Sequence, residues 1–373
     1  MLILPAGILH TEPAEAGLRD RKGRPPGPKK TGLGTEKGRT PGPKKTGFRD
    51  PEQLLQDRIC RSTGCPDMEE IMKTVNILLS AYNGEKFIAE QIESLLAQDY
   101  PAVTIHIRDD GSTDRTVEIV RQYTDRPNVK LYEGENVGYR KSFAWLLANC
   151  RDADYYAYCD QDDYWMPDKI SRAVRALERF DENTPAIYIG DFYWGDAECR
   201  PLRANRNAYK KHSLIKYITT GDMNTFGFTE VFNECAAAGI RDREPLELCV
   251  HDQIVYLYCR CAGRVIWDEK PTACYRRYGE NASPQELVGG NRLSHFVWRI
   301  RTFLLSSGRD RVYDRFREFY EAYSDIISPE DREKFSLYLN DGNRLKKAMY
   351  RGCYRDKKTE DLMIRVLFLM GKV

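Results

Sequence analysis

From Val75 onward, short apolar runs alternate with segments whose apolar residues have helical spacing. The apolar runs end in small or polar residues and predict buried strands at 75–81, 103–108, 129–132 and 154–159. The intervening segments predict helices over 87–98, after 110–114, over 141–149, and from Pro167, which occupies a favoured first-turn position. We expect Thr113 or Asp114 to cap the second of these helices. Strands and helices that alternate in this way predict an α/β fold with a mostly parallel sheet covered on both faces.

The two ends of the chain have different patterns. Residues 1–71 are rich in Gly, Pro, Lys and Arg, and GRPPGPKKTG at 23–32 returns as GRTPGPKKTG at 38–47. Such a segment buries too little apolar surface to offset its ordering entropy, so we expect a disordered basic tail. The tail is either dispensable or a basic arm that touches RNA or anionic lipid.

Helical patterns dominate after Leu293. The segments 295–305, 311–323 and 365–371 are amphipathic and rich in Arg, Phe and Tyr. They either pack on the α/β region or lie on an anionic membrane surface, with arginines reaching the headgroups. We therefore expect three regions: a tail at 1–71, an α/β domain at 72–290 and a helical region at 291–373.

Charge and cysteine content narrow the class of protein. The 373 residues carry a net charge of +2, which does not favour a specific nucleic-acid partner. No apolar run approaches the roughly 18–20 residues that span a bilayer. The 11 cysteines form no C-x-x-C pair and have no zinc-binding spacing with histidine, which favours reduced thiols. We expect a cytoplasmic protein, with peripheral contact to the inner membrane face through the C-terminal helices as a further option.

Polar residues follow three of the predicted strands, where ligands bind in parallel sheets. They are Ser80–Asn83, Asp109–Ser112 and Asp160–Asp163. Two acidic clusters at one sheet edge repel each other unless a cation lies between them. Mg²⁺ is typically held by one or two carboxylates and substrate phosphates, so the D-x-D pair Asp160 and Asp162 predicts a Mg²⁺ or Mn²⁺ site.

Four segments together resemble the serial signatures of family 2 glycosyltransferases. They are SAYNGEKFIAEQIESLLAQ, RDDGSTDRTVEIV, GENVGYRKSF and CDQDDYWMPDKI. They occur in the order that the family shows. They are most similar to the bacterial rhamnosyltransferase-like branch, which builds surface polysaccharides. The resemblance implies the GT-A fold, which is Rossmann-like, and a nucleotide-sugar donor.

The resemblance also implies a nucleotide site. Ser80 and Tyr82, at the end of the first strand, are expected to hold the nucleotide base. Asp109 and Asp110 of the D-D-G-S turn are expected among the nucleotide-binding residues, and Asp110 is expected to pair with a pyrimidine. Lys141, after the N-x-G segment, is expected to contact base or phosphate.

Metal and catalytic roles follow from the same resemblance. Asp162 is expected to bind the metal, with Asp160 near the ribose or the metal. Asp252 in the V-H-D-Q segment is expected to be the general base that deprotonates the acceptor hydroxyl, with His251 as a neighbouring or acceptor contact. The alternative is that Asp252 caps a helix over 253–259.

A further segment, near the end of the expected α/β domain, departs from the family pattern. YRRYGEN, from Tyr275, resembles a Y-R-x-H-x-x-N segment, but Tyr278 stands where the family has histidine. A contact of that histidine with metal or diphosphate is therefore in doubt here. Arg276 is expected either to meet the diphosphate with two parallel hydrogen bonds or to be a solvated strand-end arginine.

These residues predict an inverting, metal-dependent glycosyltransferase. The donor implied by the resemblance is dTDP-rhamnose or a UDP-sugar, and the acceptor a glycan or lipid-linked hydroxyl in surface polysaccharide synthesis. One alternative is a catalytically degenerate scaffold, which Tyr278 keeps open. Another is a sugar-phosphate nucleotidyltransferase, although SAYNGEKF lacks the Gly-rich turn of that class.

Overall fold

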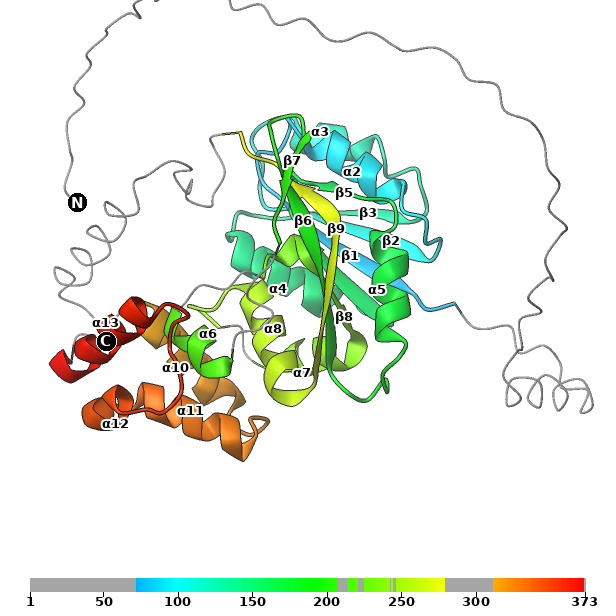
Figure 1. Ribbon diagram of the computed structural model, residues 1–373. Helices are drawn as coiled ribbons and strands as arrows, with labels where there is room; N and C mark the ends of the chain where they lie inside the picture. Colours follow the sequence, from blue (N-terminus) through cyan, green and yellow to red (C-terminus); the bar gives the residue numbers. More distant parts are fainter. Residues whose placement is uncertain are drawn as a thin grey trace, which may run out of the picture. The chain divides into compact units, whose positions relative to one another are not determined.

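A mixed nine-stranded sheet with helices on both faces organises the residues that the computed structural model describes (Figure 1). These residues are 72–206, 213–220, 225–241, 243, 246–278 and 311–371. They belong to one compact unit, Glu69–Val373. The expected tail at 1–71 and the expected boundary near residue 290 lie outside the described residues.

The first half of the sheet is parallel, and its strands agree with the predicted runs. Its order is β3 (Val129–Glu133), β2 (Val103–Asp109), β1 (Val75–Ala81) and β4 (Tyr155–Cys159). The connecting helices are α2 (Ile88–Leu96), α3 (Thr116–Arg121) and α4 (Tyr139–Asn149). The Asp114 carboxylate accepts the Thr116 N–H at 3.0 Å, so it satisfies a first-turn donor of α3 as predicted. The α/β class and the parallel arrangement are confirmed here.

The second half of the sheet is mixed, which the sequence pattern did not predict. Its strands are β5 (Tyr164–Trp165), β6 (Ala186–Gly195), β7 (Pro201–Ala204), β8 (Glu230–Asn233) and β9 (Arg264–Tyr275). β8 is antiparallel to β4 and β6, whereas β6 and β9 are parallel. The associated helices are α5 (Lys169–Leu177), α6 (Leu214–Thr220), the short η2 (Gly227–Thr229), α7 (Glu234–Arg241) and α8 (His251–Ala262).

Two apolar clusters cover the two faces of the sheet. Alternate residues of β1 point to opposite faces, so Ile77 and Leu79 belong to one cluster and Leu78 to the other. α2 and α5 contribute to the first cluster, while α4, α7 and α8 contribute to the second. Both faces are therefore buried, as a parallel sheet requires.

The C-terminal helices extend the second cluster. They are α10 (Arg311–Tyr323), α11 (Pro329–Leu339), the short η3 (Asp341–Asn343), α12 (Arg344–Ala348) and α13 (Lys358–Met370). Phe316 and Phe319 of α10 are fully buried in that cluster, and Glu318 accepts the backbone N–H of Leu248 at 2.9 Å. The predicted packing of this region on the α/β domain is thus observed, although segment 295–305 lies outside the described residues. None of the described helices is long and apolar enough to cross a membrane.

Candidate active site

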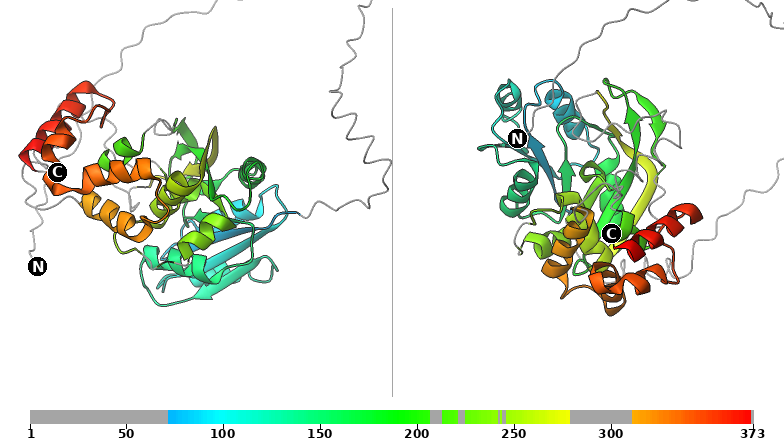
Figure 2. Two further views of the ribbon diagram at one scale, coloured as in Figure 1. Left: turned by 90° about the horizontal axis from the view of Figure 1, so that it is seen from below. Right: turned by 90° about the vertical axis from the view of Figure 1, so that its left-hand side faces the viewer.

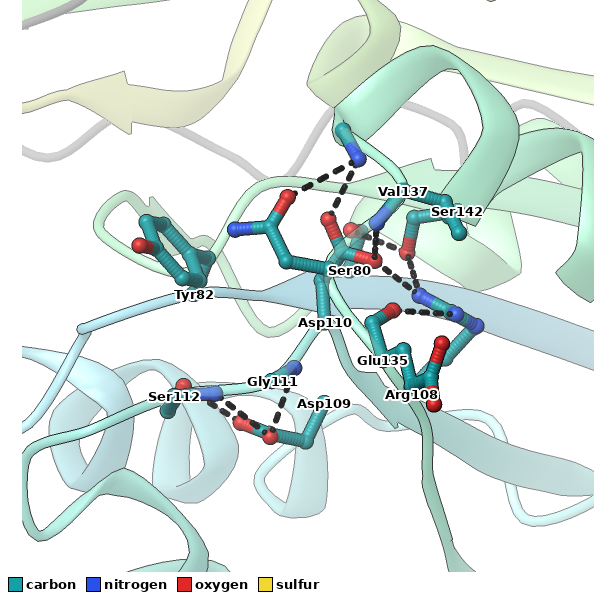
Figure 3. A network of polar contacts seen from close by, with 12 residues as sticks. Ser80, Tyr82, Arg108, Asp109, Asp110, Gly111, Ser112, Glu135, Val137 and Ser142 are labelled. Carbon is teal, nitrogen blue, oxygen red and sulfur yellow. Dashed lines mark hydrogen bonds and ion pairs between the residues drawn. The ribbon is translucent and has the colours of Figure 1, made fainter.

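The turn after β2 is shaped by Asp109. Its carboxylate accepts the N–H of Gly111 at 3.1 Å and of Ser112 at 2.9 Å, and the Ser112 hydroxyl at 2.5 Å. Gly111 has a φ of +77°, a conformation that residues with a Cβ rarely adopt. Asp109 was expected among the nucleotide-binding residues, and in this structure its carboxylate organises the turn that follows it (Figure 3).

Asp110 joins this turn to the start of α4. Its side chain is 2% exposed, forms an ion pair with Arg108, and accepts the backbone N–H of Val137 at 3.0 Å and of Gly138 at 2.8 Å (Figure 3). Three such donors fix the position of the carboxylate. Asp110 therefore fixes the loop that borders the sheet edge, where it was expected to meet a pyrimidine.

Ser80 belongs to the same network. The hydroxyls of Ser80 and Ser142 are hydrogen-bonded at 2.6 Å, and the Arg108 guanidinium donates to Ser142 at 3.1 Å and to the Glu135 carbonyl at 3.1 Å (Figure 3). The end of β1, the end of β2 and the first turn of α4 are thus tied together. The sequence analysis assigned no role to Arg108 or Ser142, although both lie within segments that resemble the family.

Tyr82 presents an exposed ring at the same edge. Tyr82 as a whole is 45% exposed. Its backbone N–H donates to the Gln161 side-chain amide oxygen at 2.8 Å, and its carbonyl accepts from the amide nitrogen at 3.0 Å. A Cβ at position 84 would collide with that amide, which explains Gly84. Gln161, the middle residue of D-x-D, therefore links the β1 end to the acidic turn, and the exposed ring remains available for stacking.

The acidic turn after β4 concentrates carboxylates in a buried place. Burial, followed by the charges of Asp162 and Asp252, raises the pKa of Asp160 well above its usual range. Burial also raises the pKa of Asp162. A cation would relieve both effects, because it favours the ionised carboxylates. Among the described residues no group of three or more His, Cys, Asp or Glu side chains could hold a metal ion. Mg²⁺ typically takes one or two carboxylates from a protein when substrate phosphates supply further oxygens.

Arg276 lies beneath this turn and is 1% exposed. Its guanidinium donates to the Asp162 carbonyl at 2.8 Å, to the Ala197 carbonyl at 2.5 Å and to Glu90 at 2.7 Å, and lies over the Phe87 ring. Arg276 is therefore not the solvated strand-end arginine that was the alternative. It fixes the backbone of the D-x-D turn from below.

Tyr278 reaches the acidic turn from the end of β9. Its hydroxyl donates to Asp162 Oδ2 at 2.6 Å, and its ring lies 4.6 Å from that of Phe87. This hydrogen bond favours the ionised form of Asp162 and therefore lowers its pKa, in opposition to burial. The residue that departs from the family pattern thus contacts the expected metal ligand directly.

Asp252 and His251 begin α8. The helix starts at His251 with Val250 as its N-cap, so Asp252 lies within the first turn rather than at the cap that was the alternative. Burial raises the pKa of Asp252 to about 6, and its carboxylate accepts the Gln253 N–H at 2.7 Å. A base whose pKa lies near the working pH is suited to proton abstraction.

The His251 ring is enclosed by aromatic groups. It stacks on Phe143 at 3.9 Å and meets the edge of Tyr158 at 4.7 Å. Both ring nitrogens are buried without a hydrogen-bond partner among the described residues. Burial lowers the pKa of His251 to about 3, so the ring is neutral and able to meet an uncharged hydroxyl.

Lys169 is a buried residue near the acidic turn that the sequence analysis did not identify. Lys169, from the W-M-P-D-K segment, is fully buried with its Nζ 4.5 Å from the centre of the Trp165 ring. Burial lowers its pKa to about 7, against the opposing effect of Cys159, Glu230 and Asp163. Lys169 therefore places a buried amino group near the Asp163 and Glu230 carboxylates, and only the motif's fixed spacing could have indicated it.

A cavity of about 460 Å³ lies between α4, α7, α8 and α10. Its wall is largely apolar and includes Leu147, Tyr323 and His251, with Arg140 and Lys141 at the start of α4. The Lys141 side chain is 63% exposed and its Nζ lies 3.9 Å from Glu247 Oε1. Lys141 thus lines this cavity, one turn away from the loop that Asp110 holds.

Part of the chain matches a known family model. Residues 76–247 match the family model described as Glycosyl transferase family 2. The dTDP-rhamnosyl transferase RfbG of Shigella flexneri is 26% identical over 216 residues, which are 54% of this chain and 72% of that protein. An uncharacterized glycosyltransferase of Rickettsia typhi is 30% identical over 116 residues, 31% of this chain. The chain spans only 36% of the length of that Rickettsia protein.

Solved structures with related architecture include two transferases. S. aureus TarS 1–349 in complex with UDP-GlcNAc has a TM-score of 0.45 and 16% identity, over 80% of this chain and 92% of that chain. The mannosyltransferase PcManGT from Pyrobaculum calidifontis, in complex with GDP-Man and Mn²⁺, has a TM-score of 0.42 and 14% identity, over 86% and 92%. The match to the family model and the observed α/β sheet agree with the expected GT-A class.

Proposed function

We propose that this chain, which carries a family 2 glycosyltransferase domain over residues 76–247, transfers a sugar with inversion from a nucleoside-diphosphate sugar to an acceptor hydroxyl. The proposed donor is dTDP-rhamnose or a UDP-sugar, which the similarity to RfbG supports. The proposed acceptor is a glycan or a lipid-linked intermediate of surface polysaccharide synthesis.

One observation carries the proposal. The fold brings Asp252, at the start of α8, near the Asp160–Asp162 turn after β4, so that the charge of Asp252 raises the pKa of Asp160. A candidate base therefore lies near two candidate metal ligands, although they are far apart in sequence. This combination of groups suits an inverting transfer that uses a metal ion.

Each group has a defined part in the proposed reaction. The Asp252 carboxylate takes the proton of the acceptor hydroxyl. The acceptor oxygen bonds to the anomeric carbon while the bond from that carbon to the diphosphate oxygen breaks. A Mg²⁺ or Mn²⁺ ion held by Asp162 and Asp160 would stabilise the negative charge of the leaving nucleoside diphosphate. Tyr82 stacks with the base, and Arg276 positions the D-x-D turn.

A nucleotide panel tests this function. UDP, dTDP, GDP and CDP are each titrated into the full chain by calorimetry, with and without Mn²⁺. We expect binding by a pyrimidine diphosphate that depends on Mn²⁺, because the metal ligands repel the diphosphate unless a cation is present. A folded protein that binds none of the four would contradict the transferase proposal.

The same panel examines the degenerate-scaffold alternative, which one contact favours. The Tyr278 hydroxyl occupies Asp162 Oδ2, an oxygen that a metal would otherwise use. If this contact prevents metal binding, the wild-type chain will not respond to Mn²⁺ while the Tyr278→His variant will.

Replacing Tyr278 by phenylalanine should shift the pH dependence of metal binding upward. Tyr278 donates to the ionised Asp162 and lowers its pKa, so its removal raises that pKa and protons compete more strongly with Mn²⁺ at low pH. Calorimetry of Mn²⁺ with UDP between pH 5 and 8 would show the midpoint move to higher pH, by about one unit for about 1.4 kcal/mol of lost stabilisation.

Tyr193→Phe provides the matched control, because Tyr193 lies on β6 and has no side-chain hydrogen bond among the described residues. An unchanged midpoint in Tyr278→Phe would show that the hydrogen bond does not stabilise the Asp162 carboxylate.

A further inference from the structure

α12 and α13 form a firmly held helical hairpin at the C-terminal end of the described chain. Arg365 of α13 donates to the Ala348 carbonyl at 2.8 Å, to the Tyr350 carbonyl at 2.7 Å and to the Gly352 carbonyl at 2.6 Å. Nearer the connection, Asp361 accepts the Tyr354 N–H at 2.6 Å. The end of α12 is therefore fixed against the middle of α13, and the two helices are held in one arrangement (Figure 2, red and orange-red).

α13 is apolar on two opposite sides. Ile364, Leu367 and Phe368 are buried in the core cluster and hold the helix on the domain. Leu362, Val366, Leu369 and Met370 are 64%, 45%, 51% and 51% exposed. Their spacing of four, three and one residues places them in one stripe. Since the buried side already anchors the helix, this second stripe is not needed to hold α13 in the fold.

α12 adds two more exposed apolar side chains. Leu345 and Met349, one turn apart, are 64% and 70% exposed. Six of the thirteen large apolar side chains that are exposed among the described residues therefore lie on this one hairpin. Scattered exposed apolar residues need no explanation, whereas a concentration of this kind marks an interaction surface.

Positive charge accompanies the apolar residues. Four exposed cations of the hairpin and its connection have no carboxylate within ion-pair distance in the described part of the chain: Arg344, Lys346, Arg351 and Lys358. Elsewhere on the hairpin, Lys357 pairs with Glu360 at 2.8 Å. The hairpin thus carries both exposed apolar side chains and positive charge that no carboxylate pairs within the described residues.

We propose that the α12–α13 hairpin docks on an anionic lipid surface. Such a surface accepts apolar side chains below the headgroups and attracts the four cations above them. A second copy of the chain is a poorer partner, because two identical faces would bring these cations against each other. The proposal concerns a surface outside the active site, and it holds whatever the sugar donor is.

Vesicle co-sedimentation of the full chain tests this docking. We expect binding to vesicles of phosphatidylcholine mixed with phosphatidylglycerol, and much weaker binding to phosphatidylcholine alone or at high salt. The triple variant Met349→Ser, Leu362→Ser, Leu369→Ser should bind at least about tenfold more weakly, since each substitution removes apolar area from the contact. The double variant Lys346→Glu, Lys358→Glu should lose the preference for anionic vesicles.

Leu202→Ser is the matched control, because Leu202 is 68% exposed on β7 and lies outside the hairpin. It should bind vesicles as the wild type does, and thermal unfolding should show that all variants are folded. Wild-type protein that ignores anionic vesicles would overturn the proposal. So would a triple variant that still binds them, which would place the contact elsewhere in the chain. Light scattering that shows a dimer, made monomeric by the triple variant without any vesicle binding, would assign the surface to a second copy.

Discussion

Replacing Asp252 by asparagine is expected to leave donor affinity near wild type and to lower turnover by about 10²–10⁴-fold, the usual loss when a general base is removed. Asparagine has the same shape, and its amide oxygen can still accept the Gln253 N–H that Asp252 accepts at 2.7 Å. The start of α8 should therefore persist, while proton abstraction is lost. Donor affinity from calorimetry and turnover from nucleoside-diphosphate release measure the two effects separately.

Asp314→Asn is a suitable control for this substitution. Asp314 also lies in the first turn of a helix, α10, so the control repeats the charge change at a helix start outside the candidate site. Near-normal turnover in Asp252→Asn would return Asp252 to the role of a helix-start residue that stabilises N–H donors. A loss of donor affinity as large as the loss of turnover would instead place Asp252 in the donor pocket.

The parallel half of the fold could be predicted because its signal is local. β1 is buried along nearly its whole length, and the run VNILLSA matches its bounds. β6 and β9 gave no comparable signal, since their pairing shifts register between Gly190 and Phe192, and β9 contains Asp268, Lys270 and Pro271. A strand with such interruptions has neither a continuous apolar run nor a strict alternation.

The site shows the same division between local and long-range information. Asp110, Asp160 and Asp162 follow their strands directly, so the sequence places them at one sheet edge. The surroundings of Arg276 depend on β9 pairing with β5, which brings Cys274 opposite Tyr164 and draws the next residues under the acidic turn. Sequence spacing does not reveal which carbonyls and carboxylates will surround a guanidinium. The observed partners of Arg276 could therefore not be predicted from the sequence.

Asp162→Ala should abolish metal-dependent donor binding and leave the fold intact. The substitution removes a carboxylate that we assign to the metal, and loss of even an outer partner of a metal site costs about 10–100-fold in affinity, so we expect about 100-fold or more here. The fold should persist because the structural bond at this position uses the backbone: the Asp162 carbonyl accepts the Arg276 Nε at 2.8 Å, and alanine keeps that carbonyl. Calorimetry with UDP and dTDP at several Mn²⁺ concentrations measures the effect.

Asp125→Ala gives the control, since Asp125 is an exposed aspartate in the turn after α3. Donor affinity that is unchanged in Asp162→Ala at saturating Mg²⁺ would remove Asp162 from the metal site. Because the Tyr278 hydroxyl donates to Asp162, the variant also removes that hydrogen bond, and Asp162→Ala combined with Tyr278→Phe separates the two causes. If the loss belongs to the metal ligand, the double variant will bind donor as weakly as Asp162→Ala alone. Recovery of binding would instead show that the Tyr278 hydroxyl obstructs the site once its contact with Asp162 is lost.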